Sequence, residues 1–195
     1  MRIIAGSSKG KTLFPPPDSR TRPTSDRARE GLFSSLESEF TSMQALHFLD
    51  LFAGSGAVGV EALSRGASIV HSVESESTME SIATKNFQSI KSPLGTYQVF
   101  HTAVTRFLES DHAAANGQYD IIFMDPPYEL SNQSIEELLR VIKERSLLQP
   151  KGIIAVERES KSSPFAWPDG MEEIKVRSYG QGSIFYGGYS ASVLL

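Results

Sequence analysis

The stretch LDLFAGSGAVG, residues 49–59, places a glycine-rich loop directly after an apolar segment that is typical of a buried strand. The loop contains the pattern Gly-x-Gly-x-x-Gly at Gly54, Gly56 and Gly59. The next apolar segment ends at Glu74, 20 residues after Gly54. In dinucleotide-binding folds, an acid at this spacing binds the hydroxyl groups of a ribose. The order strand, glycine loop, helix, strand and acid therefore predicts a site for a cofactor that contains adenosine.

One acid near the loop helps to distinguish NAD from S-adenosylmethionine, because the glycine loop alone fits both cofactors. Asp50 lies at the end of the predicted strand, close to the glycine turn. A carboxylate there would repel the pyrophosphate of NAD at the helix N-terminus, where an anion is otherwise favoured. The same carboxylate would attract the ammonium or sulfonium group of S-adenosylmethionine, which is therefore the cofactor that we expect. A helix-capping acid is the alternative interpretation of Asp50.

Strands and helices alternate from Leu46 onward, which predicts a mostly parallel sheet with helices on both faces. Helices are expected near residues 57–65, 77–91, 103–110 and 132–146. Strands are expected near residues 46–51, 68–73, 97–101, 119–124, 152–157, 171–178 and 183–190. The predicted fold class is α/β, with a doubly wound, Rossmann-like sheet of seven strands. A small hairpin at residues 3–14 and a helix capped by Thr24 are expected to precede it.

A second motif follows the apolar segment YDIIFM, residues 119–124, which is typical of a buried strand. Asp125 offers a carboxylate acceptor, and Pro126 offers a carbonyl whose direction is restricted by two successive prolines. Tyr128 offers an aromatic face on which a planar ring can stack. Two acceptors beside a stacking surface suit the exocyclic amine of a nucleobase.

The expected topology brings the two motifs together. In a doubly wound sheet ordered 3-2-1-4-5, strands 1 and 4 are neighbours at the switch point, where ligands bind. The glycine loop leaves the first predicted strand, and residues 125–128 leave the fourth. We therefore expect the cofactor and the amine acceptors in one crevice.

The distribution of charge indicates where a polyanion would dock. The chain has a formal net charge of −4, but residues 1–30 contain seven basic and three acidic residues. A basic arm on an acidic body favours docking of a nucleic acid at the amino-terminal end, although a solvated charged segment is the alternative. The candidate phosphate contacts are Arg2, Lys9, Lys11, Arg22 and Arg27.

Composition limits the remaining possibilities. The chain has 195 residues, of which 39% are hydrophobic, which fits one globular domain with a small extension. It has no run of eighteen apolar residues that would predict a transmembrane helix. It also has no cysteine, and its four histidines lack close ligand spacing, so we expect no disulfide and no metal site. The expected protein is a cytoplasmic monomer that does not associate with a membrane.

Several stretches of the chain resemble known families. The glycine loop and residues 125–128 are similar to the paired signatures of the DPPY-type amino-methyltransferases, which modify nucleobases. A closer resemblance is to the bacterial enzymes that methylate N2 of a guanine in 16S (small-subunit) ribosomal RNA. It runs over nearly the whole chain and is carried by residues 49–67, by MRIIAG at residues 1–6, by Lys9-Gly10-Lys11, by Arg22-Pro23-Thr24, by Asp26-Arg27 and by Arg29-Glu30.

This resemblance implies a basic hairpin and helix extension at residues 1–42 and an S-adenosylmethionine-dependent methyltransferase domain at residues 43–195. The implied partner is ribosomal RNA or an assembling small ribosomal subunit. The chain departs from the family at residues 101–104, HTAV, where an Asp or Asn often holds the adenine amine, so backbone groups are expected to serve there. The implied catalytic residues are Asp125, Pro126 and Tyr128, and the implied cofactor contacts are Asp50, Phe52, Ala53, Gly54, Gly56, Glu74, Ala103 and Asp125.

Three other functions stay open at this point. An adenine-N6 or cytosine-N4 methyltransferase acting on DNA or RNA fits the chemistry of the tetrapeptide, which suits any exocyclic amine; only the resemblance of the amino-terminal stretch points to guanine in ribosomal RNA. An NAD-linked oxidoreductase would leave residues 125–128 without an explanation and is disfavoured by Asp50. An RNA-binding protein without activity would not need the glycine loop.

Overall fold

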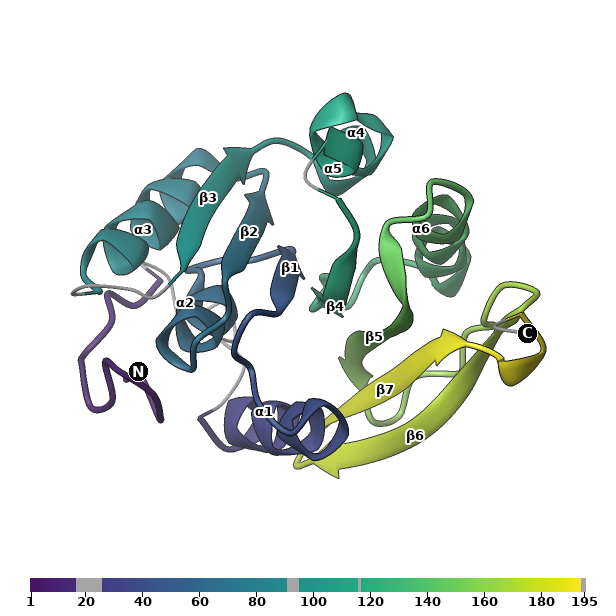
Figure 1. Ribbon diagram of the computed structural model, residues 1–195, viewed down its shortest axis with the longest axis horizontal. Helices are drawn as coiled ribbons and strands as arrows, with labels where there is room; N and C mark the ends of the chain where they lie inside the picture. Colours follow the sequence, from purple (N-terminus) through teal and green to yellow (C-terminus); the bar gives the residue numbers. More distant parts are fainter. Residues whose placement is uncertain (17–25, 91–94, 116, 194–195) are drawn as a thin grey trace.

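Seven strands form one mixed sheet in the computed structural model, which describes residues 1–16, 26–90, 95–115 and 117–193 (Figure 1). The strand order is β3-β2-β1-β4-β5-β7-β6. Adjacent strands from β3 to β5 are parallel, β7 is antiparallel to β5, and β6 is antiparallel to β7. The predicted doubly wound α/β fold is confirmed. The strands are β1 (His47–Leu51), β2 (Ile69–Glu74), β3 (Thr96–His101), β4 (Tyr119–Met124), β5 (Leu148–Glu159), β6 (Met171–Tyr179) and β7 (Gly182–Tyr189).

Helices cover both faces of the sheet. Successive side chains along each strand point to opposite faces, so they pack into two separate cores. In β4, Ile121 and Phe123 pack in the core beneath α1, α2 and α3, whereas Ile122 and Met124 pack in the core beneath α4, α5 and α6. In the described ranges, no helix is long and apolar enough to cross a membrane. The helices are α1 (Asp26–Phe40), α2 (Ala57–Ser64), α3 (Ser77–Gln88), α4 (Val104–Glu109), α5 (Asp111–Ala115) and α6 (Asn132–Glu144), with a 3₁₀ turn at Ala191–Val193.

Two elements differ from the sequence prediction. Strand β5 begins at Leu148 rather than near residue 152, even though Pro150 lacks a backbone N–H group. Its pairing with β4 changes register between Tyr119 and Ile121, so the proline lies beside an irregular stretch of the ladder. The helix expected at residues 103–110 is α4, but the short helix α5 was not predicted; it follows Ser110, which adopts an extended conformation.

The amino-terminal segment folds back on itself and docks on the sheet domain. Strands of the predicted hairpin meet at the antiparallel bridge between Arg2 and Thr12. A Cβ atom on Gly6, which has φ 82°, would lie 1.9 Å from the carbonyl oxygen of Ser64, so only glycine allows this approach to the end of α2. Ile3 and Leu13 are buried in the same core as the sheet. The predicted cap residue Thr24 lies outside the described residues.

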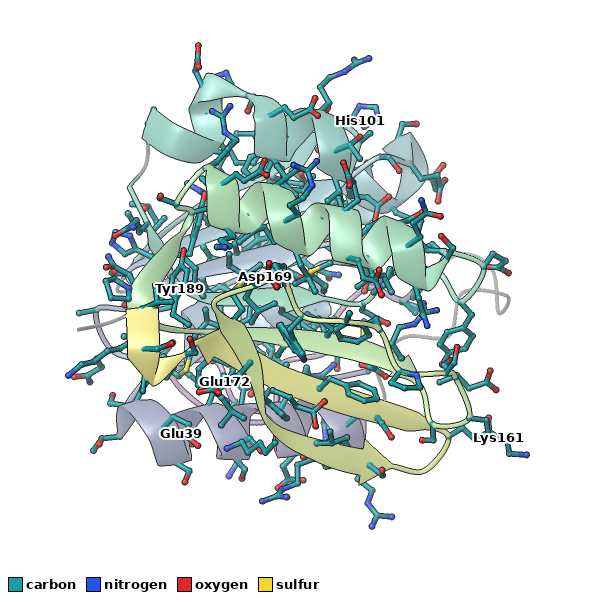
Figure 2. The ribbon with its side chains drawn as sticks, turned by 90° about the vertical axis from the view of Figure 1, so that its right-hand side faces the viewer. Glu39, His101, Lys161, Asp169, Glu172 and Tyr189 are labelled. Carbon is teal, nitrogen blue, oxygen red and sulfur yellow. The ribbon has the colours of Figure 1, made fainter. Side chains whose placement is uncertain are left out.

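Helix α1 closes the opposite end of this face against the β6–β7 hairpin (Figure 2). Glu39 of α1 forms an ion pair of 2.6 Å with Lys175 of β6. A Cβ atom on Gly31 would lie 2.1 Å from the ring of Tyr179, so the helix and the strand pack in close contact. Tyr179 is therefore held at the carboxyl edge of the sheet.

A buried carboxylate in α2 ties the amino-terminal segment to the fold. Glu61 is fully buried and accepts hydrogen bonds from the backbone N–H groups of Ile4 (2.8 Å) and Ala5 (2.9 Å). It also accepts one from Nε of Arg65 at 2.9 Å. The guanidinium of Arg29, likewise fully buried, lies 3.7 Å from the other oxygen of Glu61. Glu61 thus joins three segments that are distant in the sequence.

We expect Glu61→Ala to lower the free energy of unfolding by about 3–5 kcal/mol, because it removes one side of a buried ion pair. The same change also leaves two backbone N–H groups without their acceptor. Urea denaturation of the purified variant measures this loss. Glu37→Ala is the matched control, because Glu37 is 40% exposed and pairs with Arg65 from the surface. The control should cost about 1 kcal/mol or less; equal losses in the two variants would contradict the buried junction.

Candidate active site

The strand register brings four residues to one level at the carboxyl edge of the sheet. Leu51 of β1 is paired with both Val73 of β2 and Met124 of β4, and Met124 is paired with Val156 of β5. The next residue along each strand therefore lies at the crevice where an open α/β sheet binds its ligands. These residues, in the order of the strands, are Glu74, Phe52, Asp125 and Glu157.

The glycine loop is held across this edge by the predicted acid. Phe52 (φ 62°), Gly54 (φ 54°) and Gly56 (φ 73°) all adopt left-handed backbone conformations, which form the tight turn between β1 and α2. The carboxylate of Glu74 accepts a hydrogen bond from the N–H of Gly54 at 2.8 Å and another from the N–H of Glu76 at 2.8 Å. The spacing of 20 residues between Gly54 and Glu74 thus corresponds to a direct contact.

A cavity of about 440 Å³ lies between the glycine loop and the end of β4. It is also walled by Ala28 of α1 and by Tyr179, so helix α1 and the β6–β7 hairpin close its far side. The two motifs therefore share one crevice, as the expected topology requires. The predicted site residues that line it are Phe52, Ala53, Gly54, Glu74, Asp125, Pro126 and Tyr128.

A second cavity of about 450 Å³ adjoins the first and has Phe52 and Glu74 in its lining as well. It extends toward the start of α4, where it is lined by Ala103, the remaining predicted cofactor contact on this side. Glu74 therefore lies at the junction of the two cavities and lines both of them.

Asp50 is buried beneath the glycine loop and does not line either cavity. Its carboxylate accepts a hydrogen bond from the N–H of Gly59 at 3.0 Å, in the first turn of α2. This geometry is that of the helix-capping acid considered as the alternative. The pKa of Asp50 is raised to about 8, chiefly by burial and also by the charges of Asp125 and Glu74, while the hydrogen bond from Gly59 lowers it.

The residues after β4 differ in their burial. Asp125 is half-buried, Pro126 is buried, and the ring of Tyr128 is 45% exposed at the mouth of the first cavity. Buried Arg158 of β5 donates hydrogen bonds to the carbonyl groups of Pro127 (3.4 Å) and Leu130 (3.0 Å). Arg158 therefore fixes the loop that carries the tetrapeptide.

Arg158 and Asn86 have structural functions that the sequence analysis missed, because neither belongs to a motif. Asn86 of α3 is fully buried and accepts a hydrogen bond from the N–H of Phe14 at 2.8 Å. Its amide group donates to the carbonyl groups of Phe14 (3.1 Å) and Ser55 (2.9 Å). The amino-terminal segment is thus tied directly to the glycine loop.

The predicted phosphate contacts fall into two groups. Arg2, Lys9 and Arg27 are exposed, and Arg27 precedes the cavity-lining residue Ala28. Lys11 is half-buried, and its ammonium donates a hydrogen bond to the carbonyl of Ser89. Arg22 lies outside the described residues.

Comparisons with known proteins agree with this architecture. The family model described as Conserved hypothetical protein 95 matches residues 1–187. The chain is 32% identical to Ribosomal RNA small subunit methyltransferase D of Haemophilus influenzae over 92% of this chain and 89% of that protein. Its identity to the protein of the same name from Escherichia coli is 34%, over 82% and 75% of the two chains. The solved structure of yhhF from Escherichia coli, a provisionally assigned methyltransferase, superposes with a TM-score of 0.80 at 30% identity, covering 97% of this chain and 98% of that one.

The raised pKa of Asp50 predicts a pH dependence of stability. The folded state binds this proton more tightly than an unfolded chain, whose aspartate has a pKa of 3.8. The resulting stabilisation is fully present below pH 3.8 and is lost as the pH rises toward about 8. Asp50→Asn keeps an acceptor for Gly59 but cannot ionise. The parent protein should therefore lose stability relative to this variant, measured as the free energy of unfolding, as the pH rises from 5 to 8.

Urea denaturation across this pH range measures the difference between the two proteins. Asp50→Ala is the control, because it removes the acceptor for Gly59 as well as the charge. It should be less stable than Asp50→Asn at every pH. Parallel pH profiles for the parent and Asp50→Asn would contradict a raised pKa.

Proposed function

Because the chain belongs to the family described as Conserved hypothetical protein 95 and has relatives named as small-subunit ribosomal RNA methyltransferases, we propose that it methylates the exocyclic N2 amine of a guanine in that RNA. The methyl donor is S-adenosylmethionine. The observation that carries the proposal is the shared cavity, in which the glycine loop and Glu74 face the acceptors of Asp125 and Pro126.

The two adjoining cavities suit the parts of S-adenosylmethionine. Ala103 and its neighbours form an apolar wall suited to the adenine, and the carboxylate of Glu74 suits the ribose hydroxyl groups at the junction. The backbone of residues 53–55 suits the methionine end in the first cavity. Asp50 lies beneath this loop and lines neither cavity, so its part in the proposal is to hold the start of α2 through the N–H of Gly59. When bound, the cofactor supplies an electrophilic methyl group on its sulfonium sulfur.

The residues after β4 prepare the amine for attack. Asp125 and the carbonyl of Pro126 accept hydrogen bonds from N2, which favours a more tetrahedral nitrogen and stabilises the positive charge that develops on it. Tyr128 stacks on the extruded base, and such stacking is worth about 1–3 kcal/mol per base, comparable with the few kcal/mol that extrusion costs. The N2 lone pair forms the bond to the methyl carbon while the bond from that carbon to sulfur breaks. The cationic nitrogen then loses a proton to solvent.

The amino-terminal arm is proposed to bind the RNA backbone. Arg2 and Lys9 are exposed on the amino-terminal segment that Asn86 ties to the glycine loop, and Arg27 is exposed in the first turn of α1. The exposed ring of Phe14 belongs to the same segment. The arm would therefore hold RNA next to the first cavity, in which Pro16 is a lining residue.

Deletion of the gene should remove one N2-methylguanosine from small-subunit ribosomal RNA, and nucleoside mass spectrometry measures this loss. Re-expression of the parent protein should restore the modification.

Asp125→Ala should lower turnover at least about a hundredfold, because removal of one preorganised polar contact costs roughly 3–4 kcal/mol by analogy with oxyanion holes. The affinity of this variant for S-adenosylmethionine, measured by calorimetry, should change little.

The matched control for Asp125→Ala is Asp169→Ala, which changes an exposed aspartate that lines neither cavity. It should keep nearly normal turnover. Loss of N6-methyladenosine or N4-methylcytidine in the deletion strain would assign the protein to an adenine or cytosine methyltransferase instead. Near-normal turnover of Asp125→Ala would remove Asp125 from the mechanism.

The affinity for RNA should fall with salt in proportion to the number of phosphate contacts. The triple variant Arg2→Ala, Lys9→Ala, Arg27→Ala should reduce the slope of log K against log[salt] by roughly 2, at about 0.7–0.9 per contact. Filter binding across a salt series measures the slope. The control is Lys151→Ala, because Lys151 is exposed in the first half of β5, away from the carboxyl edge. An unchanged slope in the triple variant would exclude these side chains as phosphate contacts.

A further inference from the structure

Glu157 is a buried carboxylate at the carboxyl edge of β5 and belongs to neither the glycine loop nor the tetrapeptide. It is 8% exposed and lines the first cavity. Along β5, Ile153 and Ala155 face the core beneath α1, so the period of two places Glu157 on that same face. Its neighbour Arg158 therefore faces the other side, where it holds the loop after β4. Glu157 therefore lines the cavity, whereas Arg158 binds the backbone of the loop.

Glu157 lies beside Asp125. The strands β4 and β5 are parallel and in register up to Met124 and Val156, so the following residues are neighbours at the same level. Asp125 follows Met124 just as Glu157 follows Val156, and neighbouring strands lie about 4.8 Å apart. Both side chains line the first cavity. Two carboxylates are thus presented side by side to the same ligand.

The hairpin partner of β5 leaves room for this carboxylate. A Cβ atom on Gly182 of β7 would lie only 2.9 Å from Oε1 of Glu157. Gly182 also lines the cavity, and its φ does not fall in the left-handed region, so turn geometry is not what requires the glycine here. The missing side chain at this position therefore leaves space that the carboxylate of Glu157 occupies.

We propose that Glu157 accepts a hydrogen bond from N1–H of the target guanine and so selects guanine over adenine and cytosine. This inference rests on the proposed function, in which Asp125 accepts from the N2 amine. Guanine presents two adjacent donors, N1–H and N2–H, to this pair of carboxylates. Adenine and cytosine present one amine donor beside an unprotonated ring nitrogen, whose lone pair a carboxylate repels. The pair of acids therefore reads the edge of an extruded base by its pattern of donors.

Glu157 would supply a discrimination between bases that Asp125 alone does not supply. The tetrapeptide is suited to any exocyclic amine, so it does not distinguish one base from another. A buried polar group left opposite the wrong partner costs about 1–3 kcal/mol, which corresponds to roughly tenfold to a hundredfold in selectivity. Glu157 is positioned to supply this discrimination at the ring nitrogen next to the reacting amine.

The test compares guanine with 2-aminopurine at the methylated position of small-subunit RNA, offered both as ligated RNA and as reconstituted subunits. 2-Aminopurine keeps the amine at C2 but carries an unprotonated N1. Glu157→Gln should lower kcat/KM for guanine at least about tenfold, because its amide cannot reproduce the charged acceptor. It should also lower the ratio of kcat/KM for guanine to that for 2-aminopurine at least about tenfold, because an amide N–H can donate to the unprotonated N1. The missing O6 of 2-aminopurine affects both proteins equally and cancels in this comparison of ratios.

Two further variants separate the effect from general damage to the fold. Gly182→Ala retains the charge but places a methyl group where the carboxylate lies, so it should also lower kcat/KM for guanine. Glu159→Gln changes an exposed acid two residues further along β5 and should leave both substrates unaffected. Thermal unfolding and the affinity for S-adenosylmethionine should be the same in Glu157→Gln as in the parent protein.

The outcomes distinguish this inference from the proposed function. If the parent protein methylates guanine and Glu157→Gln leaves the ratio of the two substrates unchanged, Glu157 does not read N1 and only the inference fails. If the parent protein methylates no guanine, the proposed function fails and the inference falls with it. A reduced ratio in Glu157→Gln, together with an unaffected Glu159→Gln, supports both.

Discussion

The in-register parallel pairing of β2, β1, β4 and β5 is the constraint on which the site depends. Because Leu51 pairs with both Val73 and Met124, the ends of three strands from distant parts of the chain lie at one level. A slip of one residue in any pair would turn a cavity-facing side chain toward the opposite core. The hydrogen bond of 2.8 Å between Glu74 and the N–H of Gly54 then fastens the glycine loop to this edge.

Buried polar contacts extend this constraint to the amino-terminal segment. Glu61 binds the backbone of Ile4 and Ala5, and Asn86 links the backbone of Phe14 to that of Ser55. The segment therefore shares its attachment points with the glycine loop and α2. A basic arm held in this way presents its exposed charges at a fixed position beside the cavity, which is what docking of a structured RNA would require.

Most of the fold was predictable because its signals are local. The apolar runs, the glycine pattern and the 20-residue spacing to Glu74 each report a short-range regularity of the chain, and the contact of Glu74 with Gly54 follows from them. The start of β5 was not predictable, because Pro150 argues against a strand unless the irregular pairing with β4 is known.

The residues of the site were predictable only where they belong to a recognisable motif. Asp125 and Tyr128 belong to a recognisable tetrapeptide, and both line the first cavity. Glu157 and Arg158 are isolated polar residues at the end of an apolar strand, and only the pairing of β5 with β4 and β7 reveals which side each one faces. The position of Asp50 beneath the loop depends on a hydrogen bond to the next helix, so sequence alone left its two interpretations open.

The placement of one ligand across both cavities can be measured directly by determining the crystal structure of the protein with S-adenosylhomocysteine. The expected complex has the adenine beside Ala103, the ribose hydroxyl groups at the carboxylate of Glu74 and the sulfur in the first cavity, on the side of Asp125. A ligand bound outside these two cavities, or one whose sulfur is directed away from Asp125, would contradict the assignment of this edge of the sheet as the site of methyl transfer.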